Sequence, residues 1–257
     1  MERELTGRIA LVTGSIGGGM GRSIALTLAR EGASIILNSG TNRKDPESAL
    51  ATVEAVHGLG AMVIHVEADT AKAEEVERMV ATGIEKFGRI DILVNNAGST
   101  WKQGDLTAIT PERWRYVVES EINGMFYCLR AVLPSMRKHG WGRVITIGMA
   151  DPLEWKGMAL DCTYAKVCRA LLMEGLAYEE RGMITFNAIK PGRIEKIPLD
   201  RAIELVNQGR AWGKRTRPTP QDVAEVVAFL CSERGRFITG STITVIGKHP
   251  QKDTMFF

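Results

Sequence analysis

Several features that would point to a membrane or a nucleic acid are missing from this chain. No apolar run approaches the ~20 residues that a membrane-spanning helix needs, and the first residues, Met1 to Glu4, are not followed by the apolar region of a secretion signal. Lys and Arg do not cluster, and 33 of them against 30 Asp and Glu leave a formal net charge of +3. We therefore expect no membrane partner, no nucleic-acid partner and a cytoplasmic location.

Cysteine is also scarce, and its spacing excludes the usual cysteine-based sites. No pair of cysteines has the CxxC spacing of a zinc site or redox motif, so we expect reduced thiols and no metal centre. Hydrophobic residues make up 44% of the chain and charged residues 25%, which is typical of a globular domain with a full core and excludes a disordered chain. The cysteines are Cys128, Cys162, Cys168 and Cys231.

What the chain does have is a regular alternation of short apolar runs with amphipathic stretches. Runs typical of strands occur at Ile9–Thr13, Ser34–Leu37, Ala61–Glu67, Ile92–Asn95, Val144–Ile147, Ile184–Ile189 and Thr242–Ile246. Helical spacing occurs over Arg22–Arg30 and Val76–Phe87, and two more helices begin at Thr110-Pro111 and Thr219-Pro220, each with a Thr N-cap before Pro. The alternation predicts one α/β domain over residues 1–257, with a doubly wound, mostly parallel sheet of about seven strands and helices on both faces.

In such a sheet, ligands bind at the carboxyl ends of the strands, and the first of these ends carries a glycine-rich loop. The loop runs from Thr13 to Gly21 with the sequence TGSIGGGMG, after a predicted strand and before a predicted helix. Glycines let a backbone approach a pyrophosphate, whose charge the helix N-terminus favours. The loop therefore indicates a nucleotide cradle; the alternative is a glycine-rich turn without a ligand.

Together with motifs further along, this loop makes nearly the whole chain resemble the short-chain dehydrogenase/reductase (SDR) family, in its 3-oxoacyl-reductase-like branch. The resemblance implies a single Rossmann-like domain that binds NAD(P) and is usually tetrameric. One departure is that the glycine loop is one residue longer than the usual TGxxxGxG. The motifs that carry the resemblance are Thr13-Gly14 with Gly19-Met20-Gly21, Asp69, Asn95-Asn96-Ala97-Gly98, the segment 142–148, the segment Asn187–Gly192, and the segment 237–241.

The resemblance also implies which residues would bind the cofactor. At the end of the second strand, Asn38-Ser39-Gly40 offers no carboxylate to accept the ribose hydroxyls of NAD, and Arg43 and Lys44 follow. This favours NADP over NAD if a cofactor binds; a solvated basic loop is the alternative. The cofactor-binding positions are Gly14, Gly19, Met20, Gly21, Asn38, Asp69, Asn96, Ala97, Gly98, Lys166, Pro191 and Gly192.

Family members reduce carbonyls with a tyrosine acid, a lysine four residues later, a serine and an asparagine. The family's Leu-Ala-x-Glu pattern, ten to thirteen residues after the lysine, is matched from Lys166 and not from Cys168. Lys166 is therefore the family lysine, and Cys162 stands at the tyrosine position. The family spacing then places Met149 at the serine position and Glu121 at the asparagine position, so only Lys166 of the catalytic set keeps the family residue.

Each replacement changes the chemistry that this site can perform. Met149 has no proton to donate to a substrate oxygen, and Cys162 is much shorter than tyrosine, with a free thiol pKa of ~8.5. Glu121 brings a negative charge, for which Lys166 is the expected ion-pair partner. Tyr164 lies ~200° around the helix from Cys162, so we expect it to face away. As soft apolar residues, Met149 and Cys162 could equally be pocket filler.

Three functional hypotheses follow. The first is a degenerate subunit that pairs with an active homologue, or with itself, through the long helix after Thr110 and the helix Thr163–Arg181, the usual tetramer faces of the family. Some acyl-thioester dehydrogenases of this family pair an active with a site-less subunit, including one in anaerobic toluene breakdown. The second is an NADP-dependent oxidoreductase with rebuilt chemistry for an activated alkene, an imine or an unusual carbonyl. The third is a lyase or cyclase that uses Glu121 and Lys166.

Overall fold

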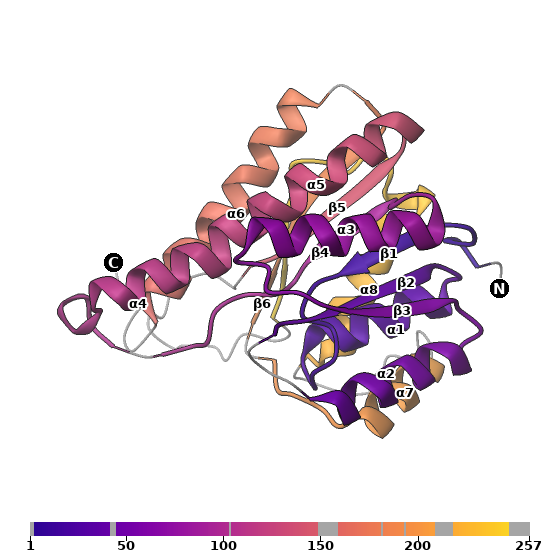
Figure 1. Ribbon diagram of the computed structural model, residues 1–257, viewed down its shortest axis with the longest axis horizontal. Coiled ribbons are helices and arrows are strands. Elements are labelled where there is room, and N and C mark those ends of the chain that lie inside the picture. Colours follow the sequence, from indigo (N-terminus) through magenta and orange to yellow (C-terminus); the bar gives the residue numbers. More distant parts are fainter. Residues whose placement is uncertain are drawn as a thin grey trace, which may run out of the picture.

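The computed structural model describes residues 3–41, 45–102, 104–148, 159–180, 182–192, 194–208 and 218–246. Within these ranges the strands form a seven-stranded parallel sheet in the order β3-β2-β1-β4-β5-β6-β7 (Figure 1), which confirms the predicted fold class. The strands are β1 (Ile9–Val12), β2 (Ser34–Ser39), β3 (Val63–Glu67), β4 (Ile92–Asn95), β5 (Gly142–Ile147), β6 (Ile184–Pro191) and β7 (Thr242–Val245).

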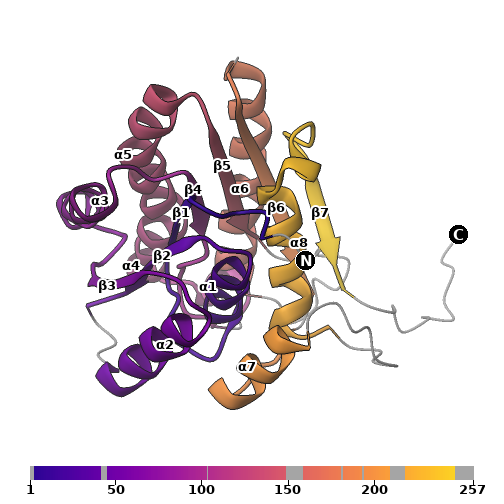
Figure 2. The same ribbon diagram turned by 90° about the vertical axis from the view of Figure 1, so that its right-hand side faces the viewer.

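Helices cover both faces of this sheet (Figure 2). Each layer has its own apolar core. The long helices are α1 (Met20–Arg30), α2 (Pro46–Gly58), α3 (Ala73–Phe87), α4 (Pro111–Val117), α5 (Gly124–His139), α6 (Leu160–Glu179), α7 (Leu199–Asn207) and α8 (Pro220–Cys231). Side chains of α1, α7 and α8 pack on one face, and those of α3, α5 and α6 on the other. Short 3-10 turns η1 (Leu106–Ala108) and η4 (Glu233–Gly235) and a π-helical segment η2 (Val118–Asn123) complete the described elements.

Local sequence explains where these elements begin. The central strands β1, β4 and β5 are buried along their whole length, as expected for a parallel sheet covered on both faces. Helix α4 starts at the predicted cap, where the side chain of Thr110 accepts a hydrogen bond from the N–H of Arg113. Helix α8 starts at the other predicted cap, where the N–H of Thr219 donates to the Asp222 carboxylate at 2.6 Å.

The topology fixes where a ligand site can lie. The sheet order reverses between β1 and β4, and in doubly wound folds the crevice outside this reversal is the usual ligand site. The glycine loop after β1 and the Asn95–Ser99 segment after β4 meet at this point, beside η2 and α6. No helix in the described residues has the length and apolar character needed to cross a membrane.

Candidate active site

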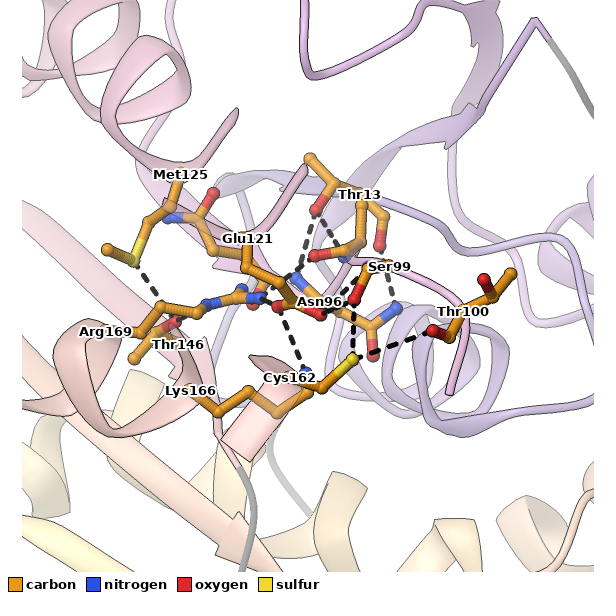
Figure 3. Close-up of polar contacts among 12 residues, drawn as sticks. Thr13, Asn96, Ser99, Thr100, Glu121, Met125, Thr146, Cys162, Lys166 and Arg169 are labelled. Carbon is orange, nitrogen blue, oxygen red and sulfur yellow. Dashed lines mark hydrogen bonds and ion pairs between the residues drawn. The ribbon is translucent and has the colours of Figure 1, made fainter. Parts of the chain in front are cut away.

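A buried carboxylate lies at the centre of the polar cluster outside β4 (Figure 3). Glu121, on the π-helical segment η2, has no exposed surface. Its Oε2 contacts Arg169 Nη1 at 2.6 Å and Lys166 Nζ at 3.2 Å, so the ion pair expected with Lys166 is present. Its Oε1 accepts hydrogen bonds from the N–H and the hydroxyl of Ser99, at 2.8 and 2.9 Å. Burial alone would raise the pKa of Glu121, but the two cations outweigh it and lower the pKa to about 2.

Arg169 is the member of this cluster that the sequence analysis missed. Its side chain is 1% exposed. Besides Glu121, the guanidinium donates to the carbonyls of Asn95 and Ala97 and to Thr146 Oγ1. A buried arginine is tolerated when its charge is paired and its donors are used, as they are here. Its spacing in the sequence could have identified it, because residue 169 lies three positions after Lys166 and therefore on the same face of the helix. It supplies the second positive charge beside the buried Glu121 carboxylate.

Gly98 gives Glu121 the room it occupies. A Cβ on Gly98 would stand 2.5 Å from Glu121 Oε1, so any side chain there would collide with the carboxylate. The close approach also brings the N–H of Ser99 within hydrogen-bond distance of the carboxylate. Gly98 was predicted as a cofactor-binding position; in the structure it makes space for a charged residue in the π-helical turn.

Cys162 is enclosed on the other side of Ser99. It is 1% exposed and belongs to a small apolar cluster with Val117, Ala159 and Ala165. Its Sγ lies 3.1 Å from Ser99 Oγ and 3.2 Å from a guanidinium nitrogen of Arg113. Burial raises the pKa of the thiol, and the charge of Arg113 only partly opposes this.

The hydrogen-bond directions identify the protonation state of this thiol. Ionised Glu121 can only accept, so the Ser99 hydroxyl must donate its single proton to Glu121. Ser99 Oγ is then an acceptor toward Cys162, and the Thr100 carbonyl, 3.6 Å from Sγ, is an acceptor as well. The thiol therefore stays protonated and donates to one of these two oxygens.

This arrangement predicts a large difference in reactivity between two cysteines of the same helix. We expect iodoacetamide at pH 8 to alkylate the exposed Cys168 at least about tenfold faster than the buried Cys162, because the thiolate is the reactive species and burial raises the pKa of Cys162. Peptide mass spectrometry over a time course measures both sites. Cys168→Ser is the control and should leave Cys162 unlabelled until the protein is unfolded; labelling of Cys162 first would contradict the structure.

The side chains of α6 divide between a buried face and an exposed face. Cys162, Lys166 and Arg169 share the face toward η2, whereas Tyr164 is 53% exposed and Cys168 is exposed. Burial lowers the pKa of Lys166, and the adjacent Glu121 opposes this shift. Glu121, Cys162 and Lys166 thus come together as expected. Met149 lies outside the described residues, as do Arg43 and Lys44.

The glycine loop fits the pyrophosphate of a dinucleotide. Helix α1 begins after Gly19 with no side-chain cap and no acidic residue in its first turn, which leaves its terminal N–H groups for an anion. A Cβ on Gly17 or Gly19 would meet no described residue within 4 Å, so none of the described side chains fills the space beside these two glycines. Gly21, by contrast, packs directly against the Gly14 carbonyl and admits no side chain. A nicotinamide dinucleotide bound here would supply the hydride.

The other predicted cofactor positions surround this loop, several of them in supporting roles. The Asn38 amide accepts from the N–H of Gly14 at 3.2 Å and donates to carbonyls of β2 and β3, so it joins the loop to the sheet. Asn96 donates to the carbonyls of Thr13 and Gly14, and the N–H of Ala97 donates to Thr13 Oγ1.

The remaining predicted positions lie at the ends of strands or begin the first helix. Asp69 is half-buried beyond β3 and accepts from the N–H of Ala71. Pro191 ends β6, with Gly192 packed against Ile246, and Met20 begins α1.

Comparisons with known proteins agree with this architecture. Residues 16–247 match the family model described as enoyl-(acyl carrier protein) reductase. The chain is 33% identical to the 3-oxoacyl-[acyl-carrier-protein] reductase FabG of Staphylococcus epidermidis, over 93% of this chain and 97% of that protein. It is 34% identical to the (2S)-[(R)-hydroxy(phenyl)methyl]succinyl-CoA dehydrogenase subunit BbsD of Thauera aromatica, over 93% of this chain and 95% of that one.

Solved structures extend the similarity to three dimensions. A dehydrogenase/reductase from Sinorhizobium meliloti aligns with a TM-score of 0.80 at 31% identity, covering 95% of each chain. Levodione reductase aligns with a TM-score of 0.80 at 30% identity, over 95% of this chain and 97% of that one. A short-chain dehydrogenase from Mycobacterium paratuberculosis, bound to NAD, aligns with a TM-score of 0.81 at 25% identity, over 95% and 97% of the two chains. With these matches over nearly its whole length, the chain belongs to the short-chain dehydrogenase/reductase family, as an oxidoreductase homologue of the FabG type.

Proposed function

We propose that this chain is a degenerate subunit of an NAD(P)-linked dehydrogenase or reductase for acyl thioesters, with little or no carbonyl-reductase activity of its own. The observation that carries the proposal is the enclosure of Cys162. At the position where the family resemblance expects the acid, the thiol is 1% exposed and donates inward to Ser99 or Thr100. A group so placed does not reach a substrate oxygen and does not protonate it.

The charges around Glu121 support the same conclusion. A proton relay needs a group that can both accept and donate, whereas Glu121, with a pKa of about 2, only accepts at neutral pH. Its two cations, Lys166 and Arg169, hold it in place. At neutral pH the cluster is thus an ion network in which Glu121 has no proton to donate.

The exposed face of α6 supports the partnership that the proposal requires. Tyr164, Leu171 and Tyr178 recur every seven residues and are 53%, 59% and 90% exposed. This spacing places them in one stripe along the helix, and Phe126 of α5 is a further exposed aromatic residue, at 48%. An apolar stripe on a helix indicates a packing surface. We propose an intact homologue, or a second copy of this chain, as the occupant; the relative BbsD is itself named as a subunit.

A charge placed in this stripe is expected to dissociate the assembly. Leu171→Glu would bury an unpaired carboxylate in the interface, so we expect light scattering after gel filtration to shift from an oligomer toward the 28.2 kDa monomer. Leu50→Glu, at a leucine of α2 that is 61% exposed, is the matched control and should leave the mass unchanged. An unchanged mass for Leu171→Glu would place the interface elsewhere.

The direct test of the proposed function is turnover. NADH and NADPH oxidation is measured with 3-oxoacyl thioesters, first with the chain alone and then with the chain co-expressed with an intact homologue of the family. We expect activity only in the second case. Rapid turnover by the chain alone would contradict the proposal.

One observation favours a second function, an NADP-dependent oxidoreductase with rebuilt chemistry. Hydrogen bonds and ion pairs connect Lys166 through Glu121 and Ser99 to Cys162 without a gap. Activated alkenes and imines need less from an acid than ketones do, so turnover of these by the chain alone would favour this function. For either function we propose NADP over NAD, since β2 ends in Asn38-Ser39 without a carboxylate.

A further inference from the structure

Helix α4 is held to the rest of the molecule by few side chains. It lies at one end of the protein, beyond the sheet and beside the start of α6 (Figure 1). Among its residues Pro111–Val117, Val117 alone is buried, in the small apolar cluster around Cys162. Arg113 precedes Val117 by one turn and therefore lies on the same face of the helix. Its polar contacts, with Val117, hold this face against α6.

Arg113 joins α4 to two other segments beside the thiol. Its Nε donates to Asp161 Oδ2 at 2.7 Å, and its Nη2 donates to the Thr100 carbonyl at 2.6 Å. The same Nη2 lies 3.2 Å from Cys162 Sγ. Asp161 is 2% exposed, and its Oδ1 accepts the N–H of Cys162 at 2.7 Å, so both of its oxygens are used. We call Arg113, Asp161 and Thr100 the clasp.

The clasp separates the thiol from solvent on the side of α4. The Arg113 side chain is 14% exposed, whereas Cys162 is 1% exposed, so the guanidinium that contacts Sγ also reaches the surface. A ligand that approaches Cys162 from this side must displace the guanidinium and separate it from Asp161. Because Asp161 is buried, leaving its charge without a partner is costly. The ion pair therefore favours the arrangement in which the thiol is covered.

We propose that α4 is a cover over the Cys162 side of the crevice and that the clasp keeps this cover closed. Once Arg113 is released, Val117 is the one buried side chain of α4 that still holds the helix in place. A short segment with so little buried surface opens locally, without unfolding of the domain. The arrangement described above is the closed one, in which a ligand does not reach the thiol. This inference concerns access to the crevice and does not depend on the proposed function.

Alkylation of Cys162 in the folded protein tests the cover, because modification of a protected group follows the population of its open state. With iodoacetamide at pH 8, we expect Arg113→Gln to label Cys162 at least about tenfold faster than wild type, since it breaks the buried ion pair. Electrostatics alone predicts the opposite sign. The charge of Arg113 lowers the pKa of the thiol, so removing that charge would leave less of the reactive thiolate.

A second variant separates the charge of Arg113 from its geometry. Arg113→Lys keeps the charge but lacks the planar fork that bridges Asp161 and Thr100, so we expect labelling at least about threefold faster than wild type. Arg115→Gln is the matched control for both variants. Arg115 lies in the same helix, is 70% exposed and pairs with Glu112 at the surface, so its loss should leave the labelling of Cys162 unchanged.

Two further measurements distinguish local opening from unfolding. Cys128 and Cys231 are buried in the core and should stay unlabelled in both Arg113 variants. Hydrogen exchange in these variants should become faster in α4 and stay unchanged in α5. Labelling of Cys162 that is unchanged or slower would overturn the cover, and so would labelling of the core cysteines in step with it, which would mean that Arg113 stabilises the whole domain. None of these readouts depends on turnover, so activity of the chain alone would refute the proposed function and leave this inference standing.

Discussion

Replacing Arg169 with methionine is expected to lower the free energy of unfolding by about 3–5 kcal/mol, the usual cost of removing one partner from a buried ion pair. The substitution roughly keeps the volume of the side chain but leaves Glu121, which has no exposed surface, with Lys166 as its one remaining cation among the described residues. It also removes the donors that the Asn95 and Ala97 carbonyls and Thr146 accept from.

Urea denaturation at pH 7 measures this effect. Arg137→Met is the control, since that arginine pairs with Glu180 at the surface and is 54% exposed, and we expect it to cost less than about 1 kcal/mol. The double variant Glu121→Gln, Arg169→Met should cost less than the sum of the two single variants, because both members of the buried pair are removed and only Lys166, whose side chain is 18% exposed, loses its partner. Additive costs would mean that the pair does not interact energetically.

The same cluster gives a pH dependence with a definite sign. The folded-state pKa of Glu121, about 2, lies below its ordinary value of 4.5. A depressed carboxylate pKa contributes stability that is fully present above the ordinary value and is lost as the pH falls toward the folded value. Wild type should therefore lose stability between about pH 5 and pH 2 more steeply than the double variant.

Restoring tyrosine alone at position 162 is expected to recover little carbonyl-reductase activity. A general acid contributes about 10²–10⁴-fold, so its absence should make the wild type very slow on 3-oxoacyl thioesters and simple ketones. In Cys162→Tyr, the position at which the family spacing predicts the serine would still carry Met149, and one lost donor of that kind costs roughly 10²–10³-fold. The ring would also have to displace the Arg113 guanidinium, which lies 3.2 Å from Sγ and is fixed by Asp161.

Steady-state NADPH oxidation by a series of variants tests this expectation. The first two members are the wild type and Cys162→Tyr. The third carries Cys162→Tyr and Met149→Ser, and the fourth adds Glu121→Asn and Arg169→Leu to these two substitutions. We expect measurable turnover only in the later members, with gains that are not additive because the groups act together. Turnover of several per second by the wild type on any of these carbonyls would show that another residue supplies the proton.

The sheet and most of its helices could be predicted because buried parallel strands are continuous apolar runs, and all seven predicted strands are present. Helix α2 was not singled out. Its apolar residues do not form one buried stripe, since Leu50 is 61% exposed while Val56 is fully buried. Helix α7 was missed as well, because its start at Pro198 lacks a polar cap.

At the site, spacing placed Glu121, Cys162 and Lys166, but it did not predict Ser99, Arg113 or Arg169. These three are identified only by what they touch. Arg113 of α4 is fixed by Asp161 of α6, and Arg169 reaches two carbonyls after β4. Such contacts join elements that are distant in sequence, and they follow from the packing of α6 on η2 rather than from any local pattern.

The pairing of Glu121 with Arg169 also limits which single substitutions this sequence tolerates at these two positions. A neutral amide at position 121 would leave a buried arginine without its carboxylate, and an apolar residue at position 169 would leave a buried carboxylate with one cation. Either first step costs a sizeable share of the roughly 5–15 kcal/mol that keeps a domain folded. A change to an uncharged site therefore requires both substitutions at nearly the same time, and selection for folding against the single substitutions keeps the charged pair in place.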